Sequence, residues 1–132
     1  MKYLCLICAE KVMEQMPPAD ADKHFEEYRE FTDSIRRSGH LIGCNRLLPP
    51  DAASTVRVRN GRVSVTDGPF AETKEQLAGF YMIEARNIDE AISLAAEIPP
   101  ACVGSIEVRP IRPIRETVAR ANAPRQAQPE NC

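Results

Sequence analysis

Two runs of this chain are apolar on both sides of an extended strand, and this feature most restricts the fold. Residues 2–8 and 78–85 place few polar positions between their apolar side chains. A strand that faces water on one side alternates apolar and polar residues, whereas a strand covered on both sides does not. Both runs therefore predict strands of a sheet that is covered on each face.

An amphipathic helix follows each of these strands. Apolar residues recur at spacings of three and four from Phe25 to Ile35, a period that is typical of a helix with one buried face. We expect Asp20 or Asp22 to cap this helix and Gly39 to end it. A second helix is expected after Asn87, because a glutamate stands three positions later at capping-box spacing.

Further strands are predicted at residues 40–48 and 104–109, so that strand–helix–strand occurs twice. Two such units form a ferredoxin-like split β-α-β sandwich of the α+β class, with both helices on one face of the sheet. The second face is also apolar, and an exposed apolar sheet associates with other surfaces. We therefore expect a homodimer in which the sheets of two copies lie face to face.

Between the two units lies a hairpin followed by a charged loop. Valines alternate with polar residues from Val56 to Thr66, and Asn60–Gly61 supplies the two positive-φ residues of a tight type I′ turn. The loop of residues 67–74 then leads into the second apolar strand. Thr73 and Gln76 have capping-box spacing, which predicts one short helical turn there.

Composition excludes several classes of function. The 132 residues suffice for one domain, and the net charge of −2 offers no basic excess for nucleic acid. No apolar run reaches the roughly 18 residues of a membrane helix, so a cytoplasmic protein is expected. No phosphate-binding or metal-binding motif is found, and no cofactor is predicted. Cys5 and Cys8 lie three apart in a strand and point to opposite faces, so we interpret both as structural thiols.

Six side chains are candidates for a functional site. Asp67 either holds its turn through backbone hydrogen bonds or acts as a general base. His24 and Glu72 are the other candidate acid–base groups, although a half-buried structural histidine and a solvated charge are the usual outcomes. Candidate substrate-binding residues are Phe70, Lys74 and Arg109, and Phe70 is expected to fill the core beneath the loop rather than to stack on a substrate.

The segment 66–75, with Gly79–Phe80–Tyr81 and Glu107–Val108–Arg109–Pro110 after it, resembles the signature of the DGPF-domain proteins within the YCII-related family. The resemblance covers roughly residues 1–111. Residues 1–115 are expected to form one domain, and residues 116–132 a flexible tail. It implies the dimeric α+β barrel. It also implies a regulatory setting with a sigma factor as a partner, since members often lie beside extracytoplasmic-function sigma factors in genomes.

Three hypotheses for the function follow. The first is a homodimer that binds a small polar molecule in a pocket near the loop of residues 67–74. The second is a cofactor-independent enzyme that uses acid–base residues. The third is a structural or regulatory interaction module. We favour the first, because no complete catalytic constellation can be assembled from the sequence.

Overall fold

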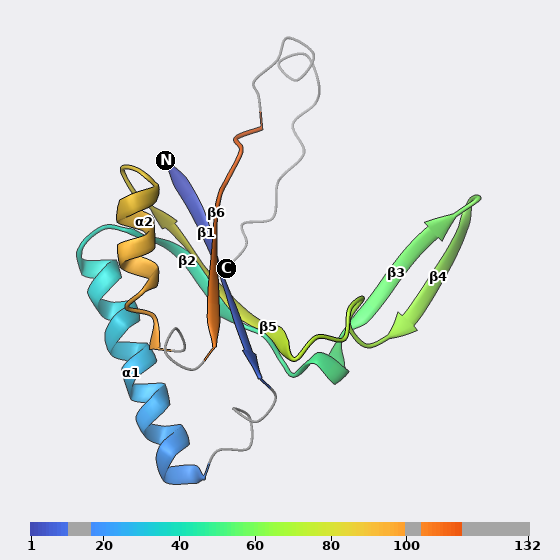
Figure 1. Ribbon diagram of the computed structural model, residues 1–132, viewed down its shortest axis with the longest axis horizontal. Coiled ribbons are helices and arrows are strands. Elements are labelled where there is room, and N and C mark those ends of the chain that lie inside the picture. Colours follow the sequence, from blue (N-terminus) through green and yellow to red (C-terminus); the bar gives the residue numbers. More distant parts are fainter. Residues whose placement is uncertain (11–16, 100–103, 115–132) are drawn as a thin grey trace.

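The computed structural model describes residues 1–10, 17–99 and 104–114. The expected tail, residues 116–132, lies outside the described residues. Figure 1 shows a layer of helices against a sheet, and a hairpin that projects from this body. The elements in chain order are β1 (Lys2–Glu10), α1 (Pro18–Arg37), β2 (Leu41–Arg46), the 3-10 turn η2 (Pro50–Ala52), β3 (Ser54–Arg59), β4 (Arg62–Asp67), β5 (Glu75–Glu84), α2 (Ile88–Ala95) and β6 (Ser105–Pro110).

The main sheet has four strands in the order β2-β5-β1-β6, and each neighbouring pair is antiparallel. Both α1 and α2 lie on the same face of this sheet (Figure 1). The two expected apolar runs are the two central strands, because β1 and β5 pair along their whole lengths. The predicted α+β class and split β-α-β arrangement are thereby confirmed for one chain.

The core lies between this sheet and the two helices. On β1 the alternate residues Tyr3, Cys5 and Ile7 are buried, and Tyr81 and Ile83 of β5 lie beside them. Burial raises the pKa of the Cys5 thiol to about 11, so this thiol stays protonated at neutral pH. The helices complete the core with four side chains: Phe31 and Ile35 on α1, and Ala91 and Ala95 on α2.

The opposite face of the sheet is also apolar. Leu4 and Leu6 of β1 pair with Met82 and Phe80 of β5, and all four are half-buried. No helix in the described ranges covers this face, as Figure 1 shows. The strands are thus apolar on two sides, as the sequence predicts. The four residues are called the open-face residues below.

The first helix begins earlier than expected. Neither Asp20 nor Asp22 is its cap, because α1 starts at Pro18 and Pro17 occupies the N-cap position without a side-chain hydrogen bond. Proline suits the first helical position, where its missing N–H has no partner to lose. Asp20 lies in the first turn, where its charge favours the positive end of the helix dipole. The predicted end is confirmed, since Gly39 follows the C-cap with φ of +83°.

The β3–β4 hairpin is well formed but stands apart from the body (Figure 1). The predicted tight turn is confirmed, because Asn60 and Gly61 both have positive φ. The hairpin is held at its base, where the backbone N–H of Gly68 donates to the carbonyl of Ala53 at 2.7 Å. Thr55 Oγ1 donates to the Gly68 carbonyl there as well.

The expected helical turn at residues 73–76 is absent. Glu75 already belongs to β5, and the chain before it is extended or bent rather than helical. The Gln76 amide explains the difference, because it donates to the carbonyls of Ala71 and Thr73 and braces the loop from the side. Capping-box spacing is therefore present here without a helix to cap.

Candidate functional site

A cavity of about 470 Å³ separates the first half of α1 from the sheet. The helix packs on the sheet only through its second half, since its two buried residues are Phe31 and Ile35. In the first half, Phe25 is 52% exposed and lines the cavity instead of closing it. The other walls come from the end of β1, the segment after β2 and the start of β5. The cavity therefore opens directly beside the loop of residues 67–74.

Aromatic rings form one wall of this cavity. His24 and Tyr28 are successive residues on one face of α1, and their rings meet edge to face at 5.1 Å. Tyr28 in turn stacks on Tyr81 of β5, with ring centroids 6.5 Å apart. Thr32 anchors Tyr81, because the two hydroxyl groups lie 2.6 Å apart. A second cavity continues along α1 past Tyr28 and Tyr81, so the wall extends over two hollows.

Burial and charge set the protonation of this wall. Burial raises the pKa of the Tyr28 hydroxyl, with nearby Tyr81 adding to the rise and Arg46 opposing it. Burial likewise raises the pKa of Tyr81. Both hydroxyls are therefore neutral at physiological pH and can donate hydrogen bonds.

Arg46 supplies the positive charge of the cavity. It is the last residue of β2, lines both hollows and acts electrostatically on Tyr28. Within the described part of the chain its guanidinium group makes no hydrogen bond or ion pair. An arginine with open donors beside neutral phenols is suited to bind a carboxylate or another planar anion.

Glu10 lies at the rim of the same cavity. It is the last residue of β1, and Lys74 Nζ lies 3.5 Å from its carboxylate. The ion pair ties the loop of residues 67–74 to the end of β1. Sequence reasoning missed both Glu10 and Arg46, because each only ends a strand and neither stands in a recognisable motif.

The three candidate acid–base residues are not brought together within one chain. His24 lines the cavity, whereas Asp67 and Glu72 do not. Asp67 ends β4 at the base of the hairpin and is exposed, and Glu72 is exposed in the loop. The Asp67 carboxylate makes no hydrogen bond in the described ranges, and Thr55 holds the turn in its place. The residue two positions after Asp67 is Pro69, which has no N–H to donate.

The candidate substrate-binding residues are also dispersed. Phe70 is 82% exposed, so the expectation that it fills the core beneath the loop is wrong. Lys74 is exposed and pairs with Glu10 at the cavity rim. Arg109 lies on β6 opposite Leu4, where its side chain pairs with Glu107. Of these three, only Lys74 reaches the neighbourhood of the cavity.

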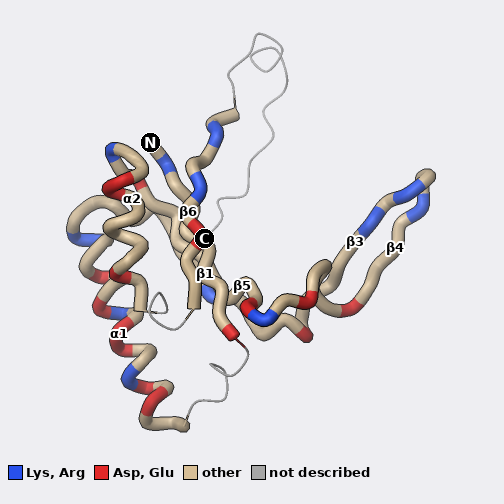
Figure 2. The backbone as a smooth tube through the Cα atoms, viewed as in Figure 1, with Lys and Arg blue, Asp and Glu red and all other residues tan. Residues whose placement is uncertain are grey.

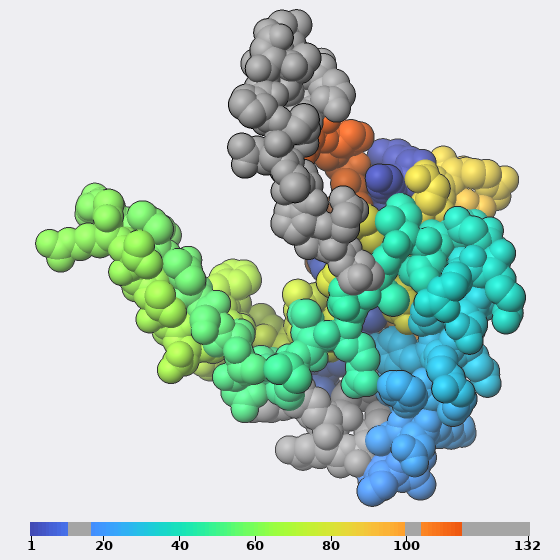
Figure 3. Space-filling view, turned by 180° about the vertical axis from the view of Figure 1, so that it is seen from behind, coloured from blue at the N-terminus to red at the C-terminus, as the bar shows by residue number. Residues whose placement is uncertain are grey.

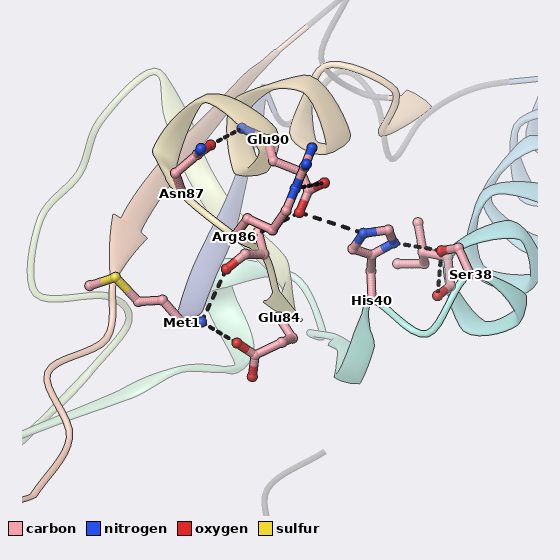
Figure 4. A network of polar contacts seen from close by, with 9 residues as sticks. Met1, Ser38, His40, Glu84, Arg86, Asn87 and Glu90 are labelled. Atoms are coloured by element: carbon pink, nitrogen blue, oxygen red, sulfur yellow. Dashed lines mark hydrogen bonds and ion pairs between the residues drawn. The ribbon is translucent and has the colours of Figure 1, made fainter.

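A polar network occupies the opposite end of the sheet (Figure 4). Asn87 caps α2 as predicted, and its side chain accepts a hydrogen bond from the Glu90 N–H. The Glu90 carboxylate accepts from the backbone N–H of Arg86, which is the largest cause of its lowered pKa, and it lies 3.7 Å from His40. His40 also contacts Ser38 at 2.7 Å. This network joins the end of α1 to the start of α2, so we interpret it as structural.

Two kinds of feature are absent from the residues that the structure describes. No group of three or more His, Cys, Asp or Glu residues in them could hold a metal ion. No helix among them is long and apolar enough to cross a membrane.

Comparison with known proteins gives two similarities. The sequence model of a family described as the YCII-related domain matches residues 1–115. An uncharacterized protein of Rhizobium meliloti (strain 1021) is 49% identical over 76 residues. The aligned part is 56% of this chain and 61% of that relative, so the chain spans less than two thirds of the relative's length.

Proposed function

The chain belongs to the YCII-related family, and from this premise we propose that it binds a small planar acid in the cavity between α1 and the sheet. The observation that carries the proposal is Arg46, whose guanidinium group has no hydrogen-bonding partner in the described part of the cavity. Arg46 is exposed, and its planar guanidinium group can bind a carboxylate through two parallel hydrogen bonds. We assign this carboxylate to the ligand.

The size and lining of the cavity support this class of ligand. A volume of about 470 Å³ lies within the range of small-molecule sites. The rings of His24 and Tyr28 offer an apolar wall for an aromatic or other planar body. The neutral Tyr28 hydroxyl can donate a hydrogen bond to the same anion that Arg46 binds. Lys74 and Glu10 then lie at the entrance, where the loop meets β1.

A homodimer is part of the proposal. The open-face residues Leu4, Leu6, Phe80 and Met82 form an apolar patch on the central strands. A second copy that presents the same patch would cover it with matching chemistry, as two-fold dimers do. Light scattering at micromolar concentration tests this, and a monomer would contradict it.

A cofactor-independent enzyme is the second candidate, because one observation favours it. His24 and Glu10 line the same cavity, so an acid–base pair could act on a bound substrate there. Asp67 and Glu72 would have no direct part in such a reaction within one chain. Nothing in the described contacts bears on a sigma factor, and that partner remains a prediction.

Thermal shift with simple probes tests the binding proposal. The probes are benzoate, 4-hydroxybenzoate and phenylacetate, each compared with its uncharged amide. We expect the acids to raise the melting temperature and the amides to have little effect. At a tenfold excess over Kd the ligand adds about 1.4 kcal/mol of stability, which corresponds to a rise of roughly 6–11 °C at the sensitivity of a 60–100-residue domain.

Two arginine variants make the test specific. Arg46→Gln should abolish the response to the acids, whereas Arg109→Gln should retain it, because Arg109 lies on β6 and does not line the cavity. If both variants lost the rise in melting temperature equally, the effect of the acids would depend only on the net charge of the protein. A full response in Arg46→Gln would refute the proposed site.

A further inference from the structure

The β3–β4 hairpin has two chemically different faces. The register pairs Val56 with Val65 and Val58 with Val63, so the four valines share one face. The opposite face carries the three arginines at positions 57, 59 and 62. Figure 2 shows these cations near the turn, at the end farthest from the body.

The valine face has no cover within the described part of the chain. All four valines are between 57% and 69% exposed. A hairpin of two strands is marginally stable in water by itself and needs a further layer on its apolar face. Figure 3 shows from behind that the hairpin stands clear of the helices and the sheet. Valine is a poor choice for a face that stays in water, so the alternation specifies a face that becomes covered.

Two further exposed apolar side chains lie near the base of the hairpin in the sequence. Phe70, just after β4, is 82% exposed, and Leu48, just before η2, is 78% exposed. Neither side chain packs on the core. Large apolar side chains exposed in one region of a protein are typical of an interface. The valine face, Phe70 and Leu48 are together called the arm surface below.

Charge points to the occupant of the arm surface. Residues 54–67 carry three arginines and one aspartate, yet the whole chain has a net charge of −2. The rest of the chain is therefore acidic, and along α1 Figure 2 marks more acidic than basic positions. The arginines lie on the face opposite the valines, so they attract the acidic body of a second copy at long range, while the valines make the contact. An acidic chain with this small basic area is a poor match for nucleic acid or for an anionic membrane.

We propose that the β3–β4 hairpin is an exchanged arm, whose valine face and base pack on a second copy of this chain. The inference rests on the proposed dimer and adds a second contact region to it. By two-fold symmetry each copy presents an arm and receives one. The open faces of the sheets then meet near the axis, and the arms clasp the outside of the pair.

Sedimentation equilibrium on matched variants tests the arm. Val63→Asp and Ser64→Asp add the same charge at adjacent positions on opposite faces of β4. We expect Val63→Asp to raise the dimer dissociation constant at least tenfold, and Ser64→Asp to change it less than threefold. Equal effects of the two variants would overturn the inference, because the face would then be irrelevant.

A third variant separates this inference from the proposed dimer. Leu6→Asp changes an open-face residue and leaves the arm intact. If Leu6→Asp dissociates the dimer and Val63→Asp does not, the arm inference fails and the sheet-to-sheet dimer stands. If the wild type is a monomer at micromolar concentration, both fail. Unchanged far-UV circular dichroism of each variant confirms that the body is folded.

Photo-crosslinking gives a test that needs no destabilising charge. A benzoylphenylalanine at position 63 is placed in a chain labelled with ¹⁵N, which is then mixed with unlabelled wild type. We expect crosslinked pairs that contain one heavy and one light chain, identified by mass spectrometry of the peptides. Crosslinks confined to the heavy chain itself, or the absence of any mixed pair, would overturn the inference.

Discussion

Gly79 lies where β2 runs against β5, and its replacement by alanine tests the sheet and the cavity together. A Cβ atom at this position would lie 2.7 Å from the carbonyl oxygen of Asn45 and 3.3 Å from Cα of Arg46. Both are backbone atoms, so relief requires β2 to move as a whole. Overpacking of this kind costs about 1–3 kcal/mol, while alanine in a strand regains about 0.5–1 kcal/mol relative to glycine. We expect a net loss of about 1–2 kcal/mol for Gly79→Ala.

Urea unfolding followed by far-UV circular dichroism measures this loss. All variants are compared at one protein concentration, because the apparent stability of a dimer depends on it. The movement of β2 also displaces Arg46, so Gly79→Ala should weaken binding of 4-hydroxybenzoate as well. An unchanged urea midpoint with an unchanged m-value would refute the close approach of the two strands.

Gly39→Ala is the matched control for this experiment. Its Cβ would meet no atom within 4 Å, but its φ of +83° is strained for alanine. That strain costs about 1–2 kcal/mol, so Gly39→Ala should lose about as much stability as Gly79→Ala. Gly39 follows α1 and does not line the cavity, so binding of 4-hydroxybenzoate should be unaffected. If both variants bound 4-hydroxybenzoate more weakly, binding would depend on the global stability of the protein and not on the position of Arg46.

Three further outcomes are expected. Glu90→Gln should lower the melting temperature at pH 7, because the pKa of Glu90 in the folded protein lies below its usual 4.5. The stabilisation by the charged carboxylate is present above pH 4.5 and is lost as the pH falls through the lowered pKa. The difference in melting temperature between wild type and variant should therefore close in acid. Tyr81→Phe should cost about 1 kcal/mol in urea unfolding, since it removes the 2.6 Å contact with Thr32, and no loss would mean that this contact is not a stabilising hydrogen bond. Cys5, whose pKa is raised to about 11, should resist iodoacetamide at pH 8 in the folded protein and react in urea, and peptide mass spectrometry that finds it modified in the native state would contradict its burial.

Local patterns predicted much of the fold. The apolar runs placed the strands β1 and β5, and Asn60–Gly61 and Asn87 marked a turn and a helix start that the structure confirms. These signals act over a few residues, so a sequence displays them directly. The predicted start of α1 was wrong because a proline can either interrupt a chain or occupy the first helical position, as Pro18 does here.

The candidate site was less accessible to such reasoning. His24 was singled out from its place on the helix, but its neighbours in the cavity come from three other segments. Arg46 lies at the cavity because the pairing of β2 with β5 places Arg46 opposite Gly79. Glu10 lies there because β1 extends as far as its pairing with Glu75. Phe70 was misplaced because an aromatic residue in a loop is usually covered by its own chain. A single sequence does not show that a surface belongs to an interface.

The position of β1 inside the sheet has a consequence for the synthesis of the protein. Both hydrogen-bonding edges of the first strand pair with strands from the last part of the chain, β5 and β6. Translation at about 5–20 residues per second leaves β1 on the ribosome for roughly 4–15 s before β5 exists. During that interval its two unpaired edges and two apolar faces are available to any other nascent strand. A chaperone that holds the first ten residues until β5 emerges would therefore raise the yield of folded protein.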